Sequence, residues 1–236
     1  MASTHWVYAA IDLGAAATAL AVALWRRQQW LQHWRRSLAV VGLVGLAFAA
    51  WDVTVTRLGH WSFNDAYVTG WHLAGLPVEE VSFFVAIPLV CLAVWEACVR
   101  AGRFATHGWY YSLALPVVSA VALVTTFPHR GYSLAAGGAA LGVAVWVYAG
   151  RRWLPAGPWL AYQLVMFGIF LVANSVLTGL PVVVYNPHTF SGLRLGTIPV
   201  EDCLYNFALT NAVVLATATL HWFCSYFCAR NQLCQK

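Results

Sequence analysis

Seven long apolar stretches constrain the fold of this 236-residue chain more than any other feature. A helix needs about 20 mainly apolar residues to cross a hydrocarbon core of about 30 Å. The stretches of suitable length are 6–25, 37–55, 77–99, 109–127, 132–149, 159–180 and 199–223. Only 9% of the residues are charged, against about 25% in soluble domains, so the chain lacks polar cover for a water-exposed surface. We therefore predict an all-α, polytopic membrane protein with about seven transmembrane helices.

The basic residues divide unevenly between the two sides of the predicted spans. Only Arg57, Arg130 and Arg194 fall on one side, whereas the other ten of the thirteen lysines and arginines fall on the opposite side. The side richer in these residues usually faces the cytoplasm, so we expect the N-terminus outside and the C-terminus in the cytoplasm of an integral protein of the cell membrane. The basic residues form no continuous face, and we expect no nucleic-acid partner.

An internal repeat is found when the chain is aligned with itself at an offset of 122 residues. Between Asp52 and Glu80, eight of 29 aligned positions are identical, and Pro77-Val78-Glu79 matches Pro199-Val200-Glu201. The offset spans four predicted helices, an even number, so spans one to three run in the same direction as spans five to seven. Such parallel repeats are related by an axis along the membrane normal. We expect a single membrane domain made of a first half (1–106), a linker helix (107–130) and a second half (131–236).

Half of the eight acidic residues stand at equivalent positions in the two halves, each pair directly after a Pro-Val dipeptide. These residues are Glu79, Glu80, Glu201 and Asp202. Proline suits the start of a helix, where free N–H groups stabilise negative charge. A solvated helix start is the simpler interpretation, but acids that open into an apolar span are candidates for function. Burial favours a neutral carboxyl and a helix start favours a charged one, so a pair can provide both an acid and a base.

Aromatic and polar residues accompany the acids at helical spacing. Phe83 and Phe84 follow the first pair, and Tyr205 and Asn206 follow the second. An aromatic stripe usually serves helix packing, but ring faces beside carboxyl groups also suit a site that stabilises a carbocation. Two further residues, Asp52 and Asn174, occupy equivalent positions and either orient the acids by hydrogen bonding or simply pair within the bundle. The histidines and cysteines have no metal-ligand spacing, and we expect no metal site.

The motifs of both halves resemble those of a known enzyme family. In the first half these motifs are Trp51-Asp52, Gly59-His60-Trp61-Ser62-Phe63-Asn64, Tyr67-Val68-Thr69-Gly70, Gly75-Leu76-Pro77-Val78-Glu79-Glu80 and Phe83-Phe84. In the second half they are Asn174, Leu177-Thr178-Gly179-Leu180-Pro181, Arg194, Thr197, Pro199-Val200-Glu201-Asp202 and Tyr205-Asn206-Phe207. With these residues the chain resembles the membrane-integral lycopene cyclases of the bacterial and archaeal small-subunit type. The resemblance covers nearly the whole chain and implies that both halves are fused here.

The resemblance implies an isomerase that cyclises lycopene to γ-carotene and β-carotene without net redox change. An acid protonates the terminal double bond at C2, the C5–C6 double bond attacks the cation, and a base removes a proton from C6. It implies that the four motif acids move these protons, in roles left open, and that Trp61 and Phe63 join the substrate site. The chemistry requires no cofactor, although assistance by a reduced flavin or nicotinamide stays open. The implied partners are lycopene, membrane lipid and other carotenoid enzymes, in an oligomeric state left open.

Two other functions fit parts of the pattern. A proton-coupled transporter also uses parallel repeats and paired intramembrane acids, although the spans that begin at Pro77 and Pro199 are mostly apolar beyond their motifs. A cyclase that forms ε or γ rings, or acts on longer carotenoids, would differ only in where the proton is removed. A covalent retinal protein is excluded, because the only lysine is the terminal Lys236.

Overall fold

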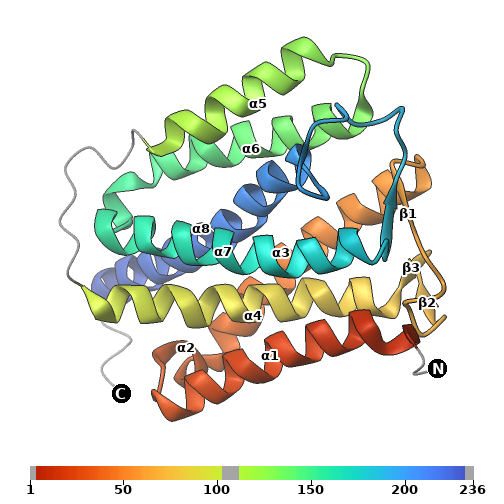
Figure 1. Ribbon diagram of the computed structural model, residues 1–236. Helices are drawn as coiled ribbons and strands as arrows, with labels where there is room; N and C mark the ends of the chain where they lie inside the picture. The colour runs from red at the N-terminus through yellow and green to blue at the C-terminus, as the bar shows by residue number, and fades with distance from the viewer. Residues whose placement is uncertain (1–3, 103–111, 232–236) are drawn as a thin grey trace.

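The protein is a bundle of long helices with short strands at one end (Figure 1). The computed structural model describes residues 4–102 and 112–231, with side chains described up to residue 220. In these ranges six helices are long and apolar enough to cross a membrane. They are α1 (Val7–Trp25), α3 (Trp34–Arg57), α4 (Val78–Ala101), α6 (Gly131–Ala149), α7 (Ala156–Gly179) and α8 (Val200–Asn231). This confirms the predicted all-α, polytopic fold class.

The fourth predicted span, 109–127, corresponds to a shorter helix. Helix α5 (Ala114–Thr126) has 13 residues, and the first part of the predicted span lies outside the described residues. At about 1.5 Å per residue its length is roughly 20 Å, which is less than a hydrocarbon core of about 30 Å. Helix α5 lies along α6, outside the two repeated halves, as Figure 1 shows at the top of the bundle. The described part of α5 is therefore too short for the predicted crossing.

Short segments link the long helices at the two ends of the bundle. At one end lie α2 (Gln29–Gln32) and the 3-10 turn η3 (Arg151–Trp153). At the other end lie the 3-10 turn η1 (Thr4–Trp6) and the strands β1 (Trp61–Phe63), β2 (His72–Leu73), β3 (Leu76–Pro77), β4 (Val183–Tyr185), β5 (Arg194–Leu195) and β6 (Ile198–Pro199). We call this second end the strand end. These strands have only two or three residues each, which is too short for an alternating pattern in the sequence to predict them.

The strands show how the two halves are arranged. Strands β2 and β3 form an antiparallel hairpin before α4, and β5 and β6 form its counterpart before α8. Strand β1 of the first half pairs antiparallel with β4 of the second, and Ser62 lies opposite Val184, which is its own equivalent at the offset of 122 residues. A residue that pairs with its own equivalent lies on a local twofold axis. The repeated halves therefore meet about an axis that runs along the bundle, as the parallel repeat predicts.

The helices that carry the acidic motifs contact both halves. Helix α4 packs against α1 and α3 of its own half and against α7 of the other, while α8 packs against α6, α7 and α3. Small residues allow close contact, as is common where helices associate in membranes. A side chain at Gly45 on α3 would lie 2.5 Å from the carbonyl oxygen of Phe84 on α4. Because α4 and α8 begin at the strand end and each contact both halves, their first turns lie close to the axis.

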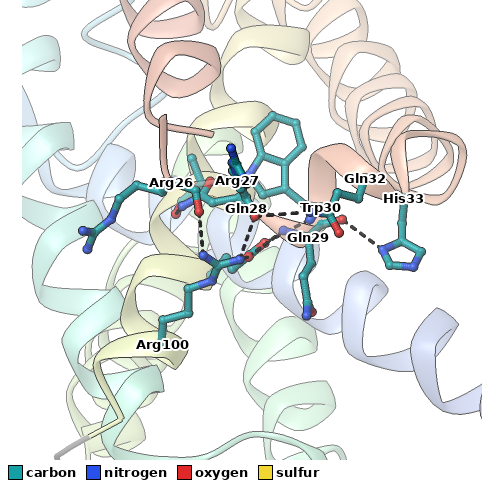
Figure 2. A network of polar contacts seen from close by, with 10 residues as sticks. Arg26, Arg27, Gln28, Gln29, Trp30, Gln32, His33 and Arg100 are labelled. Carbon is teal, nitrogen blue, oxygen red and sulfur yellow. Dashed lines mark hydrogen bonds and ion pairs between the residues drawn. The ribbon is translucent and has the colours of Figure 1, made fainter. Parts of the chain in front are cut away.

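A polar network fixes α2 at the end opposite the strands (Figure 2). The Glu96 carboxylate on α4 accepts hydrogen bonds from the backbone N–H groups of Gln29 at 2.6 Å and Trp30 at 2.9 Å, and it also pairs with Arg100. Arg100 donates to the carbonyl oxygens of Arg26 and Arg27, as Figure 2 shows. Glu96 therefore accepts hydrogen bonds from free N–H groups at the start of α2, and its role is structural.

Candidate active site

A cavity lies between the two halves near the strand end, where α4 and α8 begin. Its volume is about 110 Å³. It is lined by Tyr8, Asp52, Trp61, Phe63, Glu80, Phe83, Ile87, Tyr132, Met166, Ile169, Phe170, Ala173, Asn174, Leu177, Val183, Tyr185, Asp202, Tyr205, Asn206 and Leu209. Most of these side chains are apolar or aromatic, and the acids are few. An apolar cavity with a small number of convergent polar groups is the usual form of a small-molecule site.

The four motif acids differ in whether they line the cavity. Glu80 and Asp202 line it, whereas Glu79 and Glu201 do not, although all four are buried. Successive residues of an α-helix point about 100° apart, so two adjacent acids cannot both face the same cavity. The structure therefore brings together the second acid of each motif, one from each half, in a single cavity.

Asp202 is held by three hydrogen-bond donors. Its Oδ1 atom accepts a hydrogen bond from the hydroxyl group of Tyr132. Its Oδ2 atom accepts from the Tyr185 hydroxyl group at 2.6 Å and from the side-chain amide of Asn174 at 2.8 Å. Burial raises the pKa of Tyr185 well above its ordinary value, and the nearby Asp202 acts in the same direction, so this hydroxyl stays a donor. Three donors around one carboxylate stabilise its charge in an apolar cavity.

Glu80 has a different environment. Its Oε2 atom accepts a hydrogen bond from the hydroxyl group of Tyr8 at 2.6 Å. Asp52, the equivalent of Asn174, lines the same cavity as Glu80. The Oδ2 atom of Asp52 is buried and has no hydrogen-bond partner among the described residues. Two neighbouring carboxyl groups in an apolar cavity cannot both ionise at low cost, so this pair is suited to hold a proton.

Glu79 and Glu201 bind the loops that precede their helices. The Oε1 atom of Glu79 accepts a hydrogen bond from the backbone N–H of Thr69, and that of Glu201 accepts one from the backbone N–H of Ser191, both at 2.7 Å. Gly70 and its equivalent Gly192 have φ near +86°, which brings the chain into the sharp turn at this point. The first acid of each motif thus fixes the loop at the strand end in the same way in both halves.

Most of the predicted substrate-binding residues line the cavity. Trp61, Phe63, Phe83, Tyr205 and Asn206 do so together with Asp52 and Asn174. The ring centroid of Trp61 lies 4.9 Å from that of Tyr132, edge to face. Phe84 is buried outside the cavity. It packs against the ring of Phe83, which lines the cavity, so it supports the cavity wall from behind.

Comparison with known proteins identifies the family. The family model described as lycopene cyclase matches residues 5–98 and 129–220, which together form most of the chain. The chain belongs to the lycopene cyclase family. No curated protein and no solved structure matches it significantly. The two matched segments, one in each half, agree with a fused two-half cyclase, and the family supports lycopene cyclase activity over the transporter alternative.

Several cavity residues of this lycopene cyclase are absent from the sequence prediction. The hydroxyl donors Tyr8 and Tyr132 were missed because they are equivalent at an offset of 124 residues, two more than the offset that aligns the motifs. Tyr185 could have been found, because it is the repeat equivalent of the predicted Phe63. The α7 residues Met166, Ile169, Phe170 and Ala173 carry no polar signal that separates them from ordinary lipid-facing residues.

The cavity of the lycopene cyclase offers oxygen, amide and ring groups. In the part of the chain that the structure describes, no three His, Cys, Asp or Glu side chains gather as metal ligands would. Within the cavity only Asp52, Glu80 and Asp202 carry carboxyl groups, and Asp202 already accepts from three protein donors. The arrangement is suited to proton transfer at an apolar substrate.

Proposed function

We propose that this lycopene cyclase is an isomerase that closes β-ionone rings on lycopene, with Glu80 as proton donor and Asp202 as proton acceptor. The observation that supports these roles is their unequal surroundings in one cavity. Asp202 accepts three hydrogen bonds, one of them from Asn174, whereas Glu80 accepts one from Tyr8 and its half has the carboxyl group of Asp52 at the position equivalent to Asn174. Donors stabilise a charged carboxylate, and a neighbouring acid favours retention of a proton.

The reaction begins at the Glu80 side of the cavity. Protonated Glu80 gives its proton to C2 of an acyclic end group, and the electron pair of the terminal double bond forms the new C–H bond. The positive charge then resides on C1. Asp52 is the second carboxyl group on this side of the cavity, and because the two carboxyl groups cannot both ionise at low cost, the pair retains a proton that Glu80 can deliver. Negative charge left on Glu80 is stabilised by the Tyr8 hydroxyl group.

Ring closure and proton loss complete the isomerisation. The C5–C6 double bond attacks C1, a C1–C6 bond forms, and the charge moves to C5. Asp202 then removes the proton from C6, and the C5–C6 double bond of a β ring is restored. The aromatic wall, which includes Trp61 and Tyr205, stabilises the intermediate cation through its ring faces. No electrons are gained or lost, so these steps require no redox cofactor.

The site is proposed to lie near the external face of the membrane. Among the residues whose side chains the structure describes, seven arginines lie at the end opposite the strands, and this bias supports a cytoplasmic position for that end; they are Arg26, Arg27, Arg35, Arg36, Arg100, Arg151 and Arg152. The strand end would then face outward, with the N-terminus outside.

The activity is tested by purified protein in lipid vesicles that contain lycopene, without added flavin or nicotinamide. We expect γ-carotene and β-carotene, each with deuterium at C2 of its ring when the buffer is deuterated water. Products with ε rings would contradict the ring type, and no cyclisation until a reduced flavin is added would contradict the cofactor-free reaction.

A further inference from the structure

The cavity is not symmetric about the axis that relates the two halves. At the offset of 122 residues, Trp51 on α3 is equivalent to Ala173 on α7, and Phe48 is equivalent to Phe170. Ala173 and Phe170 line the cavity, whereas Trp51 and Phe48 do not. A large side chain in one half thus stands where the other half has a methyl group. The two sides of the cavity, α3–α8 and α4–α7, are therefore shaped differently.

The α3–α8 side is closed by aromatic rings. The ring centroid of Trp51 lies 4.7 Å from that of Tyr205 on α8 and 5.7 Å from that of Phe48. Phe48 and Tyr205 also contact each other edge to face, at 5.5 Å. Three mutually packed rings fill the space between these helices, because aromatic pairs at such distances are in direct contact. Trp51 therefore closes this side against lipid.

The α4–α7 side of the cavity is built differently. The cavity wall here is formed by Phe83 and Ile87 on α4 and by Ile169, Phe170 and Ala173 on α7. All five are only partly buried or exposed, and Ile169 is 37% exposed, so this wall reaches the outer surface of the bundle. Helix α7 is also the least buried of the six long helices. On this side the residues of the cavity wall therefore lie at the lipid-facing surface of the bundle.

The cavity is small compared with the substrate. A cavity of about 110 Å³ is too small for an entire acyclic carotenoid, so most of a bound chain would lie outside it. We propose that the polyene of lycopene lies in the groove between α4 and α7, with one end group between Glu80 and Asp202, and that Trp51 closes the equivalent groove between α3 and α8. This inference rests on the proposed function. An apolar occupant fits because the groove residues are Phe83, Ile87, Ile169, Phe170 and Ala173.

One groove fixes one orientation of the substrate at a time. The end group that enters the cavity always presents the same face to Glu80 and to Asp202, because the chain can leave only between α4 and α7. The second end of lycopene then reacts only after the chain has left the groove and returned reversed. The one-ring carotene is therefore a released intermediate, which appears in the lipid before the two-ring product.

The test compares two tryptophan substitutions on adjacent positions of α7. Ala173→Trp places an indole in the groove, as Trp51 does in the other half. The matched control is Val172→Trp, because Val172 is 71% exposed and lies outside the cavity wall. Both variants and the unchanged protein are assayed in lycopene vesicles at equal amounts of folded, monodisperse protein. We expect Ala173→Trp to lose at least about tenfold in cyclisation, since filling an apolar pocket discriminates on this scale, and Val172→Trp to stay within about twofold.

The outcomes distinguish failure of the groove proposal from failure of the proposed function. If the unchanged protein cyclises lycopene and the two tryptophan variants are equally active, the groove is overturned while the proposed function stands. If the unchanged protein does not cyclise lycopene, the proposed function fails. Should Ala173→Trp not fold, Ala173→Leu replaces it, with a smaller loss expected. Activity of Ala173→Leu equal to that of the unchanged protein would also overturn the groove.

Discussion

The second acid of the motif has different neighbours in the two halves of the molecule. In the second half Asp202 accepts hydrogen bonds from Tyr132, Tyr185 and Asn174. In the first half Glu80 accepts one from Tyr8, and the position of the amide is taken by the carboxyl group of Asp52. In the proposed mechanism, one copy of the duplicated half-site gives the proton and the other removes it. The repeat thus places the two acids at equivalent positions, and their unequal neighbours are what the proposed difference in roles depends on.

The largest expected effect follows from removing either cavity acid. Glu80→Gln and Asp202→Asn keep the shape of the side chain but cannot transfer the proton, so we expect each to lower the cyclisation rate by about 10²–10⁴. The measurement is the initial rate of γ-carotene formation in lycopene vesicles. Asp65→Asn, a matched change at an exposed loop carboxyl, should retain the full rate. Normal activity of either cavity variant would remove that acid from the mechanism.

A smaller effect is expected where the two halves differ most. Asp52→Asn gives the first half the amide that the second half has at position 174. The change removes the second carboxyl group of the pair that retains the proton, and we expect about a tenfold slower reaction, with the deficit increasing as the pH is raised. Rates measured across a range of pH values check this result. A rate equal to that of the unchanged protein at every pH would show that Asp52 only packs in the bundle.

The smallest effect on the reaction rate is expected at Glu79 and Glu201, which bind equivalent loops in the two halves. The buried Oε2 atoms of Glu79 and Glu201 have no hydrogen-bond partner among the described residues. Glu79→Gln and Glu201→Gln put an amide N–H₂ donor at these positions without an acceptor, which costs about 1–3 kcal/mol of folding stability. We expect a lower unfolding temperature and less than about a tenfold loss of rate for folded protein. Thermal unfolding in detergent measures the first and product formation the second. A loss as large as that of Glu80→Gln, without destabilisation, would place these acids in the reaction.

The sequence predicts the parts of the site that depend on local pattern. Apolar length identifies the spans, and the offset of 122 residues places Asp52, Asn174 and the acidic motifs at equivalent positions. The pairing of β1 with β4 depends on contact between distant segments, so no local pattern reveals it. Adjacent acids such as Glu79 and Glu80 look alike in sequence, and only the direction of each side chain around the helix separates them. The lipid-facing wall on the α4–α7 side likewise depends on which apolar residues meet, which apolar composition alone does not determine.

The central claim is that Glu80 gives the proton and Asp202 removes it, and deuterium exchange in the two acid variants tests it most directly. In deuterated water, Asp202→Asn should still deuterate C2, and when Glu80 then removes the hydrogen that C2 carried originally, recovered lycopene gains deuterium at C2 although no ring product accumulates. Glu80→Gln should yield neither ring product nor deuterium in recovered lycopene. Deuterium in lycopene recovered from Glu80→Gln, and none in lycopene recovered from Asp202→Asn, would reverse the two roles and contradict the account.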